Sequence, residues 1–379
     1  MGLKIQRVAI ICFLMAIFSY KTTAQLARQY KTENLRNIER LNISSMIQPL
    51  PLKNKFLDSA YNIWCGSVVK APKIGYYMFY SRWPKAKGHE AWITDSEIAL
   101  AFSEKPEGPY SHVKVIFSKR DKKYWDGVCT HNPTVIIHQG KYYLYYMGTT
   151  GSAPITPNFA YSPAWYNYRN NQRIGVAIAD NPLGQWTRFD KPILEASQDS
   201  TAPDAMLVSN PAVTIDQNGR FIMVYKQVEK NGKYQGGKVR FGVAFSSAAT
   251  GPFIKNNSPI FEEKNSSYKD AWMIAEDPFI WNYKGINYAI VRDVIGKFTG
   301  VSGALALLSS SDGINWKPTT YPMVIGKEIF DETGTKLDDK LERPCLLIEN
   351  GIPIYLFGAM GINNRAHSMN IAIPLFLKR

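Results

Sequence analysis

The stretch that decides the fold runs from Trp125 to Ile137 (Trp-Asp-Gly-Val-Cys-Thr-His-Asn-Pro-Thr-Val-Ile-Ile) and continues from Lys141 to Gly148 (Lys-Tyr-Tyr-Leu-Tyr-Tyr-Met-Gly). A polar loop leads into an Asn-Pro pair, an apolar run, a Gly turn and an aromatic run. Pro is tolerated at the first residue of a strand, and apolar runs joined by a short Gly-containing turn are typical of a β-hairpin. The stretch therefore predicts a loop that delivers polar side chains to the start of a buried strand.

The same order of residues recurs in four more places along the chain. The equivalent strand starts are Trp64-Cys65-Gly66, Ser209-Asn210-Pro211, Glu276-Asp277-Pro278 and Glu342-Arg343-Pro344. Each hairpin is followed by a third apolar run, and in four units a Gly turn then leads to a fourth short strand. Five units of short strands, repeated about every 65 to 80 residues, are typical of a radial array. We therefore predict an all-β fold, a five-bladed β-propeller over residues 61–379.

The N-terminus has the pattern of a secretory signal peptide. Within residues 1–25, Lys4 and Arg7 precede an apolar run that ends at Phe18, and a small-residue cleavage site follows. The apolar run is too short for a membrane span. We therefore expect a protein that is periplasmic or secreted.

Residues 26–60 are predicted to form a helical and extended segment before the propeller. The composition of residues 26–48 is compatible with an amphipathic helix, and a Pro-containing stretch follows at 49–58. The fifth unit ends at Arg379 without a fourth strand of its own. We expect the segment before the first unit to pack on the fifth blade and close the ring.

The charge and the cysteines restrict the function. The chain has 45 Lys and Arg against 31 Asp and Glu, and a basic exported protein meets anionic partners readily. It has no Arg-rich helix or nucleic-acid motif, so nucleic acid is not an expected partner. Cys65, Cys129 and Cys345 lack zinc spacing, and an odd number of cysteines leaves at least one thiol free. We expect them to be small buried residues and predict no metal ligands.

Propeller geometry places two sets of segments on one face: the residues before each inner strand and the loops between the second and third strands. These loops span residues 81–97, 148–173, 226–239, 292–303 and 358–368 and are longer than the turns at the other face. Long loops with polar and aromatic residues on one face of a rigid scaffold indicate a binding or catalytic site.

Five acids are expected to converge at the centre of this face: Asp126, Asp204, Glu276, Asp277 and Glu342. The first two stand seven residues before a strand-opening proline, and the others stand one or two residues before one. Glycoside hydrolysis needs a protonated acid for the leaving oxygen and an ionised carboxylate for water or the anomeric carbon. The expected sugar-binding residues are Trp64, Arg82, His131, Asn132, Asn210, Arg292 and Arg343, although for His131 a purely structural role is equally open.

These strand starts, and the Gly-Lys-Tyr-Tyr-Leu-Tyr-Tyr hairpin at 140–146, resemble the five-bladed propeller glycoside hydrolases of families 43, 32 and 117. The resemblance covers essentially the whole mature chain. Family 43 enzymes use a base Asp in the first blade, an Asp that tunes the pKa in a middle blade and an acid Glu in a Glu-Gly-Pro motif. By this resemblance Glu276, in Glu276-Asp277-Pro278, is the acid.

The chain also departs from the family 43 pattern. Cys65-Gly66 stands where that family has Asp-Pro, and Asn132 and Asn210 stand where Asp is usual. Trp125-Asp126-Gly127 resembles a tryptophan–aspartate pair of family 117, which cleaves anhydrogalactose ends of agar oligosaccharides. The resemblance implies a divergent member in which another carboxylate (Asp126, Asp204, Asp277 or Glu342) replaces the base.

The function expected from the sequence is an exo-acting glycoside hydrolase that removes a terminal sugar from a complex, anionic polysaccharide or oligosaccharide. The alternatives are a non-catalytic carbohydrate-binding propeller and, less favoured, a glycoside phosphorylase whose basic centre holds phosphate. No cofactor is expected to be required, and the resemblance leaves room for a structural calcium ion at the hub.

Overall fold

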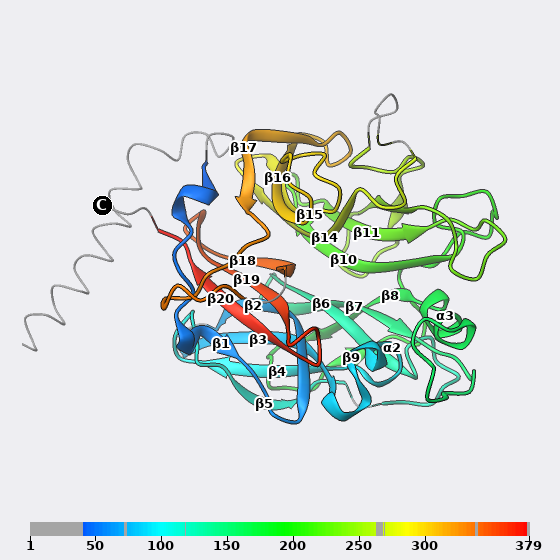
Figure 1. The fold of residues 1–379 in the computed structure, drawn as a ribbon. Coiled ribbons are helices and arrows are strands. Elements are labelled where there is room, and N and C mark those ends of the chain that lie inside the picture. Colours follow the sequence, from blue (N-terminus) through cyan, green and yellow to red (C-terminus); the bar gives the residue numbers. More distant parts are fainter. Residues whose placement is uncertain are drawn as a thin grey trace, which may run out of the picture. The chain divides into compact units, whose positions relative to one another are not determined.

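The described part of the chain is built from five four-stranded antiparallel sheets (Figure 1). The computed structural model describes residues 41–71, 74–117, 119–262, 268, 270–337 and 340–376. These fall, apart from Leu41, in one unit, Asn42–Arg379. The predicted signal peptide and most of the predicted helix at 26–48 lie outside the described residues. The last part of that predicted helix is instead a short 3₁₀ turn, η2 (Ile43–Met46).

The strands follow one another in sequence from the inside of each blade to its outside. The first blade is β2 (Tyr61–Ala71), β3 (Gly75–Pro84), β4 (Glu97–Ser103) and β5 (Ser111–Val115); the second is β6 (Cys129–His138), β7 (Lys141–Thr149), β8 (Arg173–Ala179) and β9 (Thr187–Arg188). The third is β10 (Leu207–Ile215), β11 (Phe221–Val228), β12 (Val239–Ser246) and β13 (Ile254–Lys255); the fourth is β14 (Ala275–Tyr283), β15 (Ile286–Asp293), β16 (Ala304–Ser310) and β17 (Lys317–Ile325). The prediction of a five-bladed propeller is confirmed.

The fifth blade is completed by the segment that precedes the first. It consists of β18 (Glu342–Glu349), β19 (Ile352–Ile362), β20 (His367–Pro374) and, at its outer edge, β1 (Lys55–Phe56), which follows the 3₁₀ turn η3 (Leu52–Asn54). Lys55 pairs with Ile371 and Phe56 with Asn370. Each inner strand contacts the next one around the hub, and β18 contacts β2. The predicted closure of the ring is therefore confirmed, and it ties the two ends of the described chain together.

The apolar core lies between neighbouring blades. Tyr80 and Ala99 of the first blade pack with Phe357 and Ala372 of the fifth, and equivalent clusters fill the spaces between the first and second, second and third, and third and fourth blades. Burial of such side chains stabilises a fold by about 1.5–3 kcal/mol each. Because each blade face is apolar and covered by its neighbour, the inner strands are held rigidly around the hub.

Each inner strand has a bulge near its start. The pairing register of β6 with β7 shifts between His131 and Thr134, and the other four inner strands shift at the equivalent point. A β-bulge redirects the side chains around it. The repeated bulge falls on the Asn-Pro pair or its equivalent, so this sequence signature marks the points where the inner strands turn side chains toward the hub.

The other helical segments lie in two of the long loops. The β3–β4 loop contains η4 (Lys85–Lys87), η5 (His89–Ala91) and α2 (Trp92–Asp95), and the β7–β8 loop contains α3 (Pro163–Asn170). Ser162 caps α3 by accepting from the backbone of Trp165. Trp165 Nε1 donates to the backbone oxygen of Glu90 at 3.0 Å, which ties the two loops together. Over the residues that the structure describes, no helix has the length and apolarity to cross a membrane.

Candidate functional site

Five residues in a left-handed backbone conformation form a ring at the hub. They are Cys65, Asn132, Asn210, Asp277 and Arg343, one from each inner strand, with φ between 50° and 56°. Asn and Asp visit this region readily, whereas for other L-residues it costs about 1–2 kcal/mol. Such strain persists where the surroundings over-determine the conformation, as they often do at functional sites.

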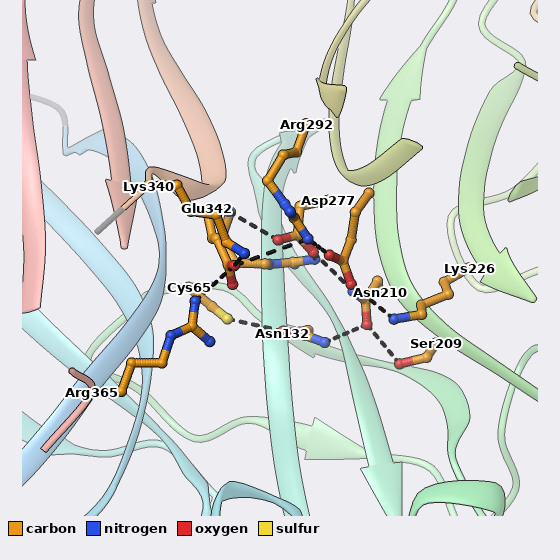
Figure 2. A network of polar contacts seen from close by, with 12 residues as sticks. Cys65, Asn132, Ser209, Asn210, Lys226, Asp277, Arg292, Lys340, Glu342 and Arg365 are labelled. Carbon is orange, nitrogen blue, oxygen red and sulfur yellow. Dashed lines mark hydrogen bonds and ion pairs between the residues drawn. The ribbon is translucent and has the colours of Figure 1, made fainter. Parts of the chain in front are cut away.

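Side-chain hydrogen bonds link the ring residues in order around the hub (Figure 2). Cys65 Sγ donates to Asn132 Oδ1 at 2.9 Å, and Asn132 Nδ2 donates to Asn210 Oδ1 at 2.6 Å. Asn210 Nδ2 donates to Asp277 Oδ1 at 3.0 Å, and Arg343 donates to both oxygens of Asp277 at 3.2 Å. The guanidinium of Arg343 also interacts with Cys65. The structure therefore brings four predicted residues together at the hub: Asn132, Asn210, Asp277 and Arg343. Their side chains already hydrogen-bond to one another.

Cys65 occupies the position that matches the base Asp in the family 43 resemblance. Burial raises the pKa of its thiol to about 12, so the sulfur stays protonated and acts as a hydrogen-bond donor within the ring. A neutral thiol cannot take the proton of a water molecule at ordinary pH. The first blade therefore supplies no base at this position. The predicted burial of Cys65, Cys129 and Cys345 is confirmed, and all three are free thiols.

A second layer of side chains comes from the residue directly before each ring residue. This layer consists of Trp64, His131, Ser209, Glu276 and Glu342. The first three are buried at 6 %, 4 % and 0 % exposure, whereas the side chains of Glu276 and Glu342 keep 16 % and 12 % of their surface exposed. Within this layer the two glutamates are therefore the members that best combine ionisable chemistry with access to solvent.

His131 is held as a structural residue. Its Nδ1 lies 2.7 Å from Ser96 Oγ, and Trp92 packs against its ring at 5.0 Å. Burial lowers the pKa of His131 well below its usual value, and nearby cationic and histidine side chains lower it further. The imidazole is therefore neutral, so of the two roles left open for this residue the geometry favours the structural one.

Glu276 is bound by cations on both carboxylate oxygens. Lys226 Nζ lies 3.0 Å from Oε1, and Arg292 Nη2 contacts Oε2. Lys226 is on β11 of the third blade and Arg292 is on β15 of the fourth. Burial lowers the pKa of Lys226 to about 8, and the neighbouring Arg169 contributes to this shift. The Lys226 ammonium therefore loses its proton more easily than an ordinary lysine does.

Glu342 stands on the fifth blade next to Glu276 and shares Arg292 with it. Arg292 Nη2 lies 4.0 Å from Glu342 Oε1, to which Arg365 Nη2 donates at 2.9 Å and near which Lys340 Nζ lies at 3.4 Å. Burial alone would raise the pKa of Glu342, but these three cations outweigh it and lower that pKa to about 2. Glu342 is therefore a carboxylate at any ordinary pH.

The hub carries more positive than negative charge. Its cations are Lys226, Arg292, Lys340, Arg343 and Arg365, and its carboxylates are Glu276, Asp277 and Glu342. A surplus of cationic side chains within a partly buried site attracts anionic ligands. Arginine in particular binds carboxylate and sulfate-like groups through paired N–H donors.

The structure does not place Asp126 among the hub acids, which corrects the sequence prediction. Its side chain has no exposed surface. Its oxygens accept from Arg120 at 2.6 Å, from the hydroxyl of Tyr146 at 2.7 Å and from Arg188 at 2.5 Å. Because Arg188 lies on β9, the outer strand of the same blade, this carboxylate braces the second blade and cannot reach a substrate.

Asp204 has the equivalent position in the third blade, and the prediction for it is corrected in the same way. Its side chain is 6 % exposed, and its Oδ2 lies 2.5 Å from Lys255 Nζ on β13, the outer strand of that blade. An acid seven residues before the strand-opening proline therefore forms an ion pair that joins the loop before the inner strand to the outer strand of the same blade. The repeat is a property of the fold and not of the catalytic chemistry.

Two predicted sugar-binding residues also have structural partners. Arg82 pairs with Glu97 at 2.9 Å and lies over the ring of Tyr61 at 4.3 Å. Both partners belong to the first blade, as Arg82 does. Trp64 is nearly buried, but Arg365 lies 5.6 Å from its ring, so it backs the cation that holds Glu342.

Arg292, a predicted sugar-binding residue, lies at the hub, and so do Lys226 and Arg365, which the sequence places on the functional face without a role; Lys340 was not predicted. Lys226 and Arg365 stand in two of the long loops that were predicted to share the functional face, 226–239 and 358–368. Their positions in those loops were a usable signal. Lys340 precedes β18 by two residues and has no equivalent in the other units, so no repeat pointed to it.

The hub does not match the requirements of a calcium ion. Calcium takes six to eight oxygen ligands, several of them carboxylates. Within the ring, the carboxylate of Asp277 is already paired with the guanidinium of Arg343 at 3.2 Å. Over the described residues, no group of three or more His, Cys, Asp or Glu side chains is placed to hold a metal ion.

The hub is narrow beyond the ring. A cavity of about 20 Å³ lies there, lined by Cys65, Thr134, Phe279 and other residues at and just after the ring positions. This volume suffices for about one water molecule and is far too small for a sugar. A ligand at Glu276 and Glu342 therefore cannot pass through the hub and must enter and leave from the face that carries the long loops.

Solved structures share this architecture at low sequence identity. A family 117 glycoside hydrolase from the marine bacterium Zobellia galactanivorans is 15 % identical with a TM-score of 0.58, and the match covers 88 % of this chain and 90 % of that one. The RGII complex of the protein BT0996 is 16 % identical with a TM-score of 0.61, and the match covers 89 % of this chain and 93 % of that one. A thermostable family 43 glycoside hydrolase is 13 % identical with a TM-score of 0.56, and that match covers 85 % of this chain and 93 % of the other.

The chain thus has the five-bladed propeller fold of the glycoside hydrolases of families 43 and 117, as predicted. No protein-family model matches the sequence, and no curated protein matches it. At this level of identity the likeness establishes the fold, and the chemistry must be argued from the residues of the hub.

Proposed function

We propose that this protein is an exported, exo-acting glycoside hydrolase that removes a terminal sugar from an anionic polysaccharide or oligosaccharide. The observation that carries the proposal is the pair Glu276 and Glu342, which come from adjacent blades and share Arg292 at the accessible end of the hub. Glycosidases act through two carboxyl groups that flank the scissile bond. Export is proposed from the signal-peptide pattern of residues 1–25.

The two carboxyl groups need different protonation states. One must be ionised to activate water or attack the anomeric carbon, and the other must deliver a proton to the leaving oxygen. Glu342 meets the first requirement because its pKa is lowered to about 2. We assign it as the base that activates water, and the Glu-Asp-Pro motif predicts Glu276 as the proton donor.

The charge of the hub and its closed far side support the finer parts of the proposal. Lys226, Arg292 and Arg365 surround the two glutamates and give the site a surplus of positive charge. A carboxylate or sulfate on the sugar would be attracted by that charge. Since the hub beyond the ring has room for only about one water, a glycan cannot thread through the hub, and removal of a terminal sugar fits a site that is closed on that side.

The proposal is tested with a panel of plant and algal oligosaccharides that includes uronic and sulfated members, with neutral glycans of matched length as controls. We expect release of a single terminal sugar from anionic members, detected by anion-exchange chromatography and mass spectrometry. Release from neutral glycans alone would contradict the anionic specificity. Products of mid-chain cleavage would contradict the exo-action.

A non-catalytic carbohydrate-binding propeller is the second candidate, and one observation favours it. The ring position of the first blade holds the protonated thiol of Cys65 where the family 43 resemblance has its base Asp. This candidate predicts that an anionic oligosaccharide binds, as measured by calorimetry, and is recovered intact after long incubation. Turnover of any bound glycan, lost in Glu342→Gln, would exclude it.

A further inference from the structure

A row of aromatic rings leads from the hub across the long loops of the first three blades. Trp92 of α2 packs against the ring of His131, a member of the second layer, at 5.0 Å and contacts Trp165 of α3 edge to face at 5.8 Å. The ring of Tyr166 lies 5.1 Å from that of Trp165 and 5.2 Å from that of Tyr234 in the β11–β12 loop. Because α2 and α3 lie side by side (Figure 1), Trp92, Trp165, Tyr166 and Tyr234 form one continuous aromatic strip.

The aromatic strip and its neighbour Tyr161 present ring surface to solvent. Tyr234 is 47 % exposed, and Trp92 and Tyr166 are half-buried. Tyr161, whose ring lies 5.1 Å from that of Trp165, is 56 % exposed and has a left-handed backbone with a φ of 56°. A bulky residue rarely adopts that conformation, and contiguous exposed apolar surface marks an interaction site. These rings are therefore a candidate binding surface.

The helix α3 holds the outer end of the strip in place. Asn170 Nδ2 donates to the backbone oxygen of Tyr234 at 2.8 Å, and Arg169 Nη1 donates to that of Gln235 at 2.9 Å. The guanidinium of Arg169 also lies 5.8 Å from the ring of Tyr166. A tyrosine held in this way offers a large contact area and loses little conformational entropy when a ligand binds. The strip is therefore preorganised for a ligand.

The inner end of the strip is connected to the surroundings of Glu342 by further ring contacts. Trp83 lies 5.7 Å from His131 and 5.4 Å from His89, and His89 lies 5.1 Å from Trp64. Trp64 in turn lies 5.6 Å from the guanidinium that donates to Glu342. The strip is therefore continuous with the candidate site.

Aromatic residues and catalytic acids occupy opposite sides of the hub. The loops of the fourth and fifth blades, 292–303 and 358–368, contain one Phe and no Tyr or Trp. Glu276 and Glu342 stand at the inner strands of these two blades. In a closed ring of five blades, the second blade, which carries α3, faces the boundary between the fourth and the fifth. A glycan that starts at the two glutamates and runs across the hub therefore meets the strip.

We propose that the aromatic strip binds the part of the glycan that leaves when the terminal sugar is removed, with its rings against the C–H faces of successive sugars. The inference rests on the proposed function, which assigns the terminal sugar to Glu276 and Glu342. The electronegative face of an aromatic ring attracts C–H groups, and a tyrosine hydroxyl bonds to sugar hydroxyls. Lys230 and Lys233, both exposed on the loop of Tyr234, attract an anionic chain.

A matched pair of variants tests the strip. Tyr234→Ala removes its last ring, and Tyr321→Ala removes a tyrosine of similar exposure, 45 %, on the outer strand β17. The substrates are the disaccharide and the hexasaccharide of the glycan that the panel identifies. We expect Tyr234→Ala to lower kcat/KM on the hexasaccharide about two- to tenfold, mainly through KM, and by less on the disaccharide, which ends before Tyr234. Tyr321→Ala should change neither.

Calorimetry makes the same comparison without turnover. Glu342→Gln is titrated with the disaccharide and the hexasaccharide, alone and combined with Tyr234→Ala. We expect the hexasaccharide to bind more tightly than the disaccharide, and this advantage to fall about two- to tenfold when Tyr234→Ala is added. A hexasaccharide that binds no more tightly than the disaccharide would overturn the inference.

The outcomes separate the inference from the proposed function. If sugar is released and Tyr234→Ala behaves like Tyr321→Ala, the inference falls and the proposed function stands. If no glycan of the panel is cleaved, the proposed function falls, and the series of the panel glycan that binds most tightly in calorimetry is used; an advantage of length that Tyr234→Ala removes then supports the strip as a glycan-binding surface. A two-chain assembly in light scattering that Tyr234→Ala makes monomeric would assign the strip to a second copy and overturn the inference.

Discussion

The acids at the start of the second and third blades and those at the start of the fourth and fifth serve different purposes. Asp126 and Asp204 pair with cations on the outer strands of their own blades. Glu276 and Glu342 instead share a cation and so join two blades. Asp126 has no exposed surface, whereas the side chain of Glu342 is 12 % exposed. The two acids paired within one blade are buried, whereas the two glutamates that share a cation between blades keep part of their side-chain surface exposed.

The largest expected effect is on catalysis, and its absence would contradict the distinction between the hub acids and the acids that brace single blades. Glu342→Gln should lower kcat/KM on the oligosaccharide identified by the panel about thousandfold or more, because it removes the carboxylate that activates water. Asp126→Asn, at a site with no exposed surface, should leave kcat/KM per folded molecule within a few-fold of wild type. Normal turnover by Glu342→Gln would show that the hub acids are also structural.

The next effect concerns stability. Asp126→Ala leaves Arg120 and Arg188, whose side chains are only 18 % and 13 % exposed, without their common partner. Removing one partner of a buried ion pair costs about 3–5 kcal/mol, to be measured as the free energy of unfolding in urea.

Asp190→Ala is the matched control for this stability effect. Asp190 pairs with the same Arg120 but is 73 % exposed, and exposed pairs contribute about 0–1 kcal/mol. Equal losses in the two variants would contradict the role of Asp126 as a buried brace.

The comparison also shows which parts of the molecule the sequence could predict. The alternation of short strands and the repeated Asn-Pro signature, or its equivalent, predicted the fold. Every blade buries two apolar faces and has one bulge in its inner strand at the hub, so both patterns recur in the sequence. The missing fourth strand of the last unit predicted that the N-terminal segment completes the ring, and β1 does so. These features either recur in every blade or complete the last one. A recurring pattern can be recognised in a single sequence, so they were predictable.

The site was predictable only where it coincides with the repeat. Glu276, Asp277 and Glu342 adjoin the ring positions, so their convergence follows from the inner strands. Asp126 also recurs, at the position of Asp204, but spacing along the chain does not say toward which strand a loop directs its side chain.

The smallest expected effect concerns the pH dependence of stability and sharpens the comparison at Glu342. The pKa of this group is lowered from an ordinary 4.5 to about 2 in the folded protein. Such a carboxylate contributes stability above its unfolded pKa, and the contribution is lost as pH falls through the folded pKa. We therefore expect the difference in unfolding free energy between wild type and Glu342→Gln to shrink between about pH 4.5 and pH 2, by at most about 3 kcal/mol.

Urea unfolding of both proteins at several pH values in this range measures that difference directly. Glu328→Gln is the control because Glu328 forms only an exposed pair with Lys336, and its difference from wild type should change by no more than the contribution of an exposed pair. A Glu342 difference that stays constant with pH would mean that Arg292, Arg365 and Lys340 do not hold the carboxylate ionised. In that case the distinction between the hub acids and the blade acids would lie in access to solvent and not in charge.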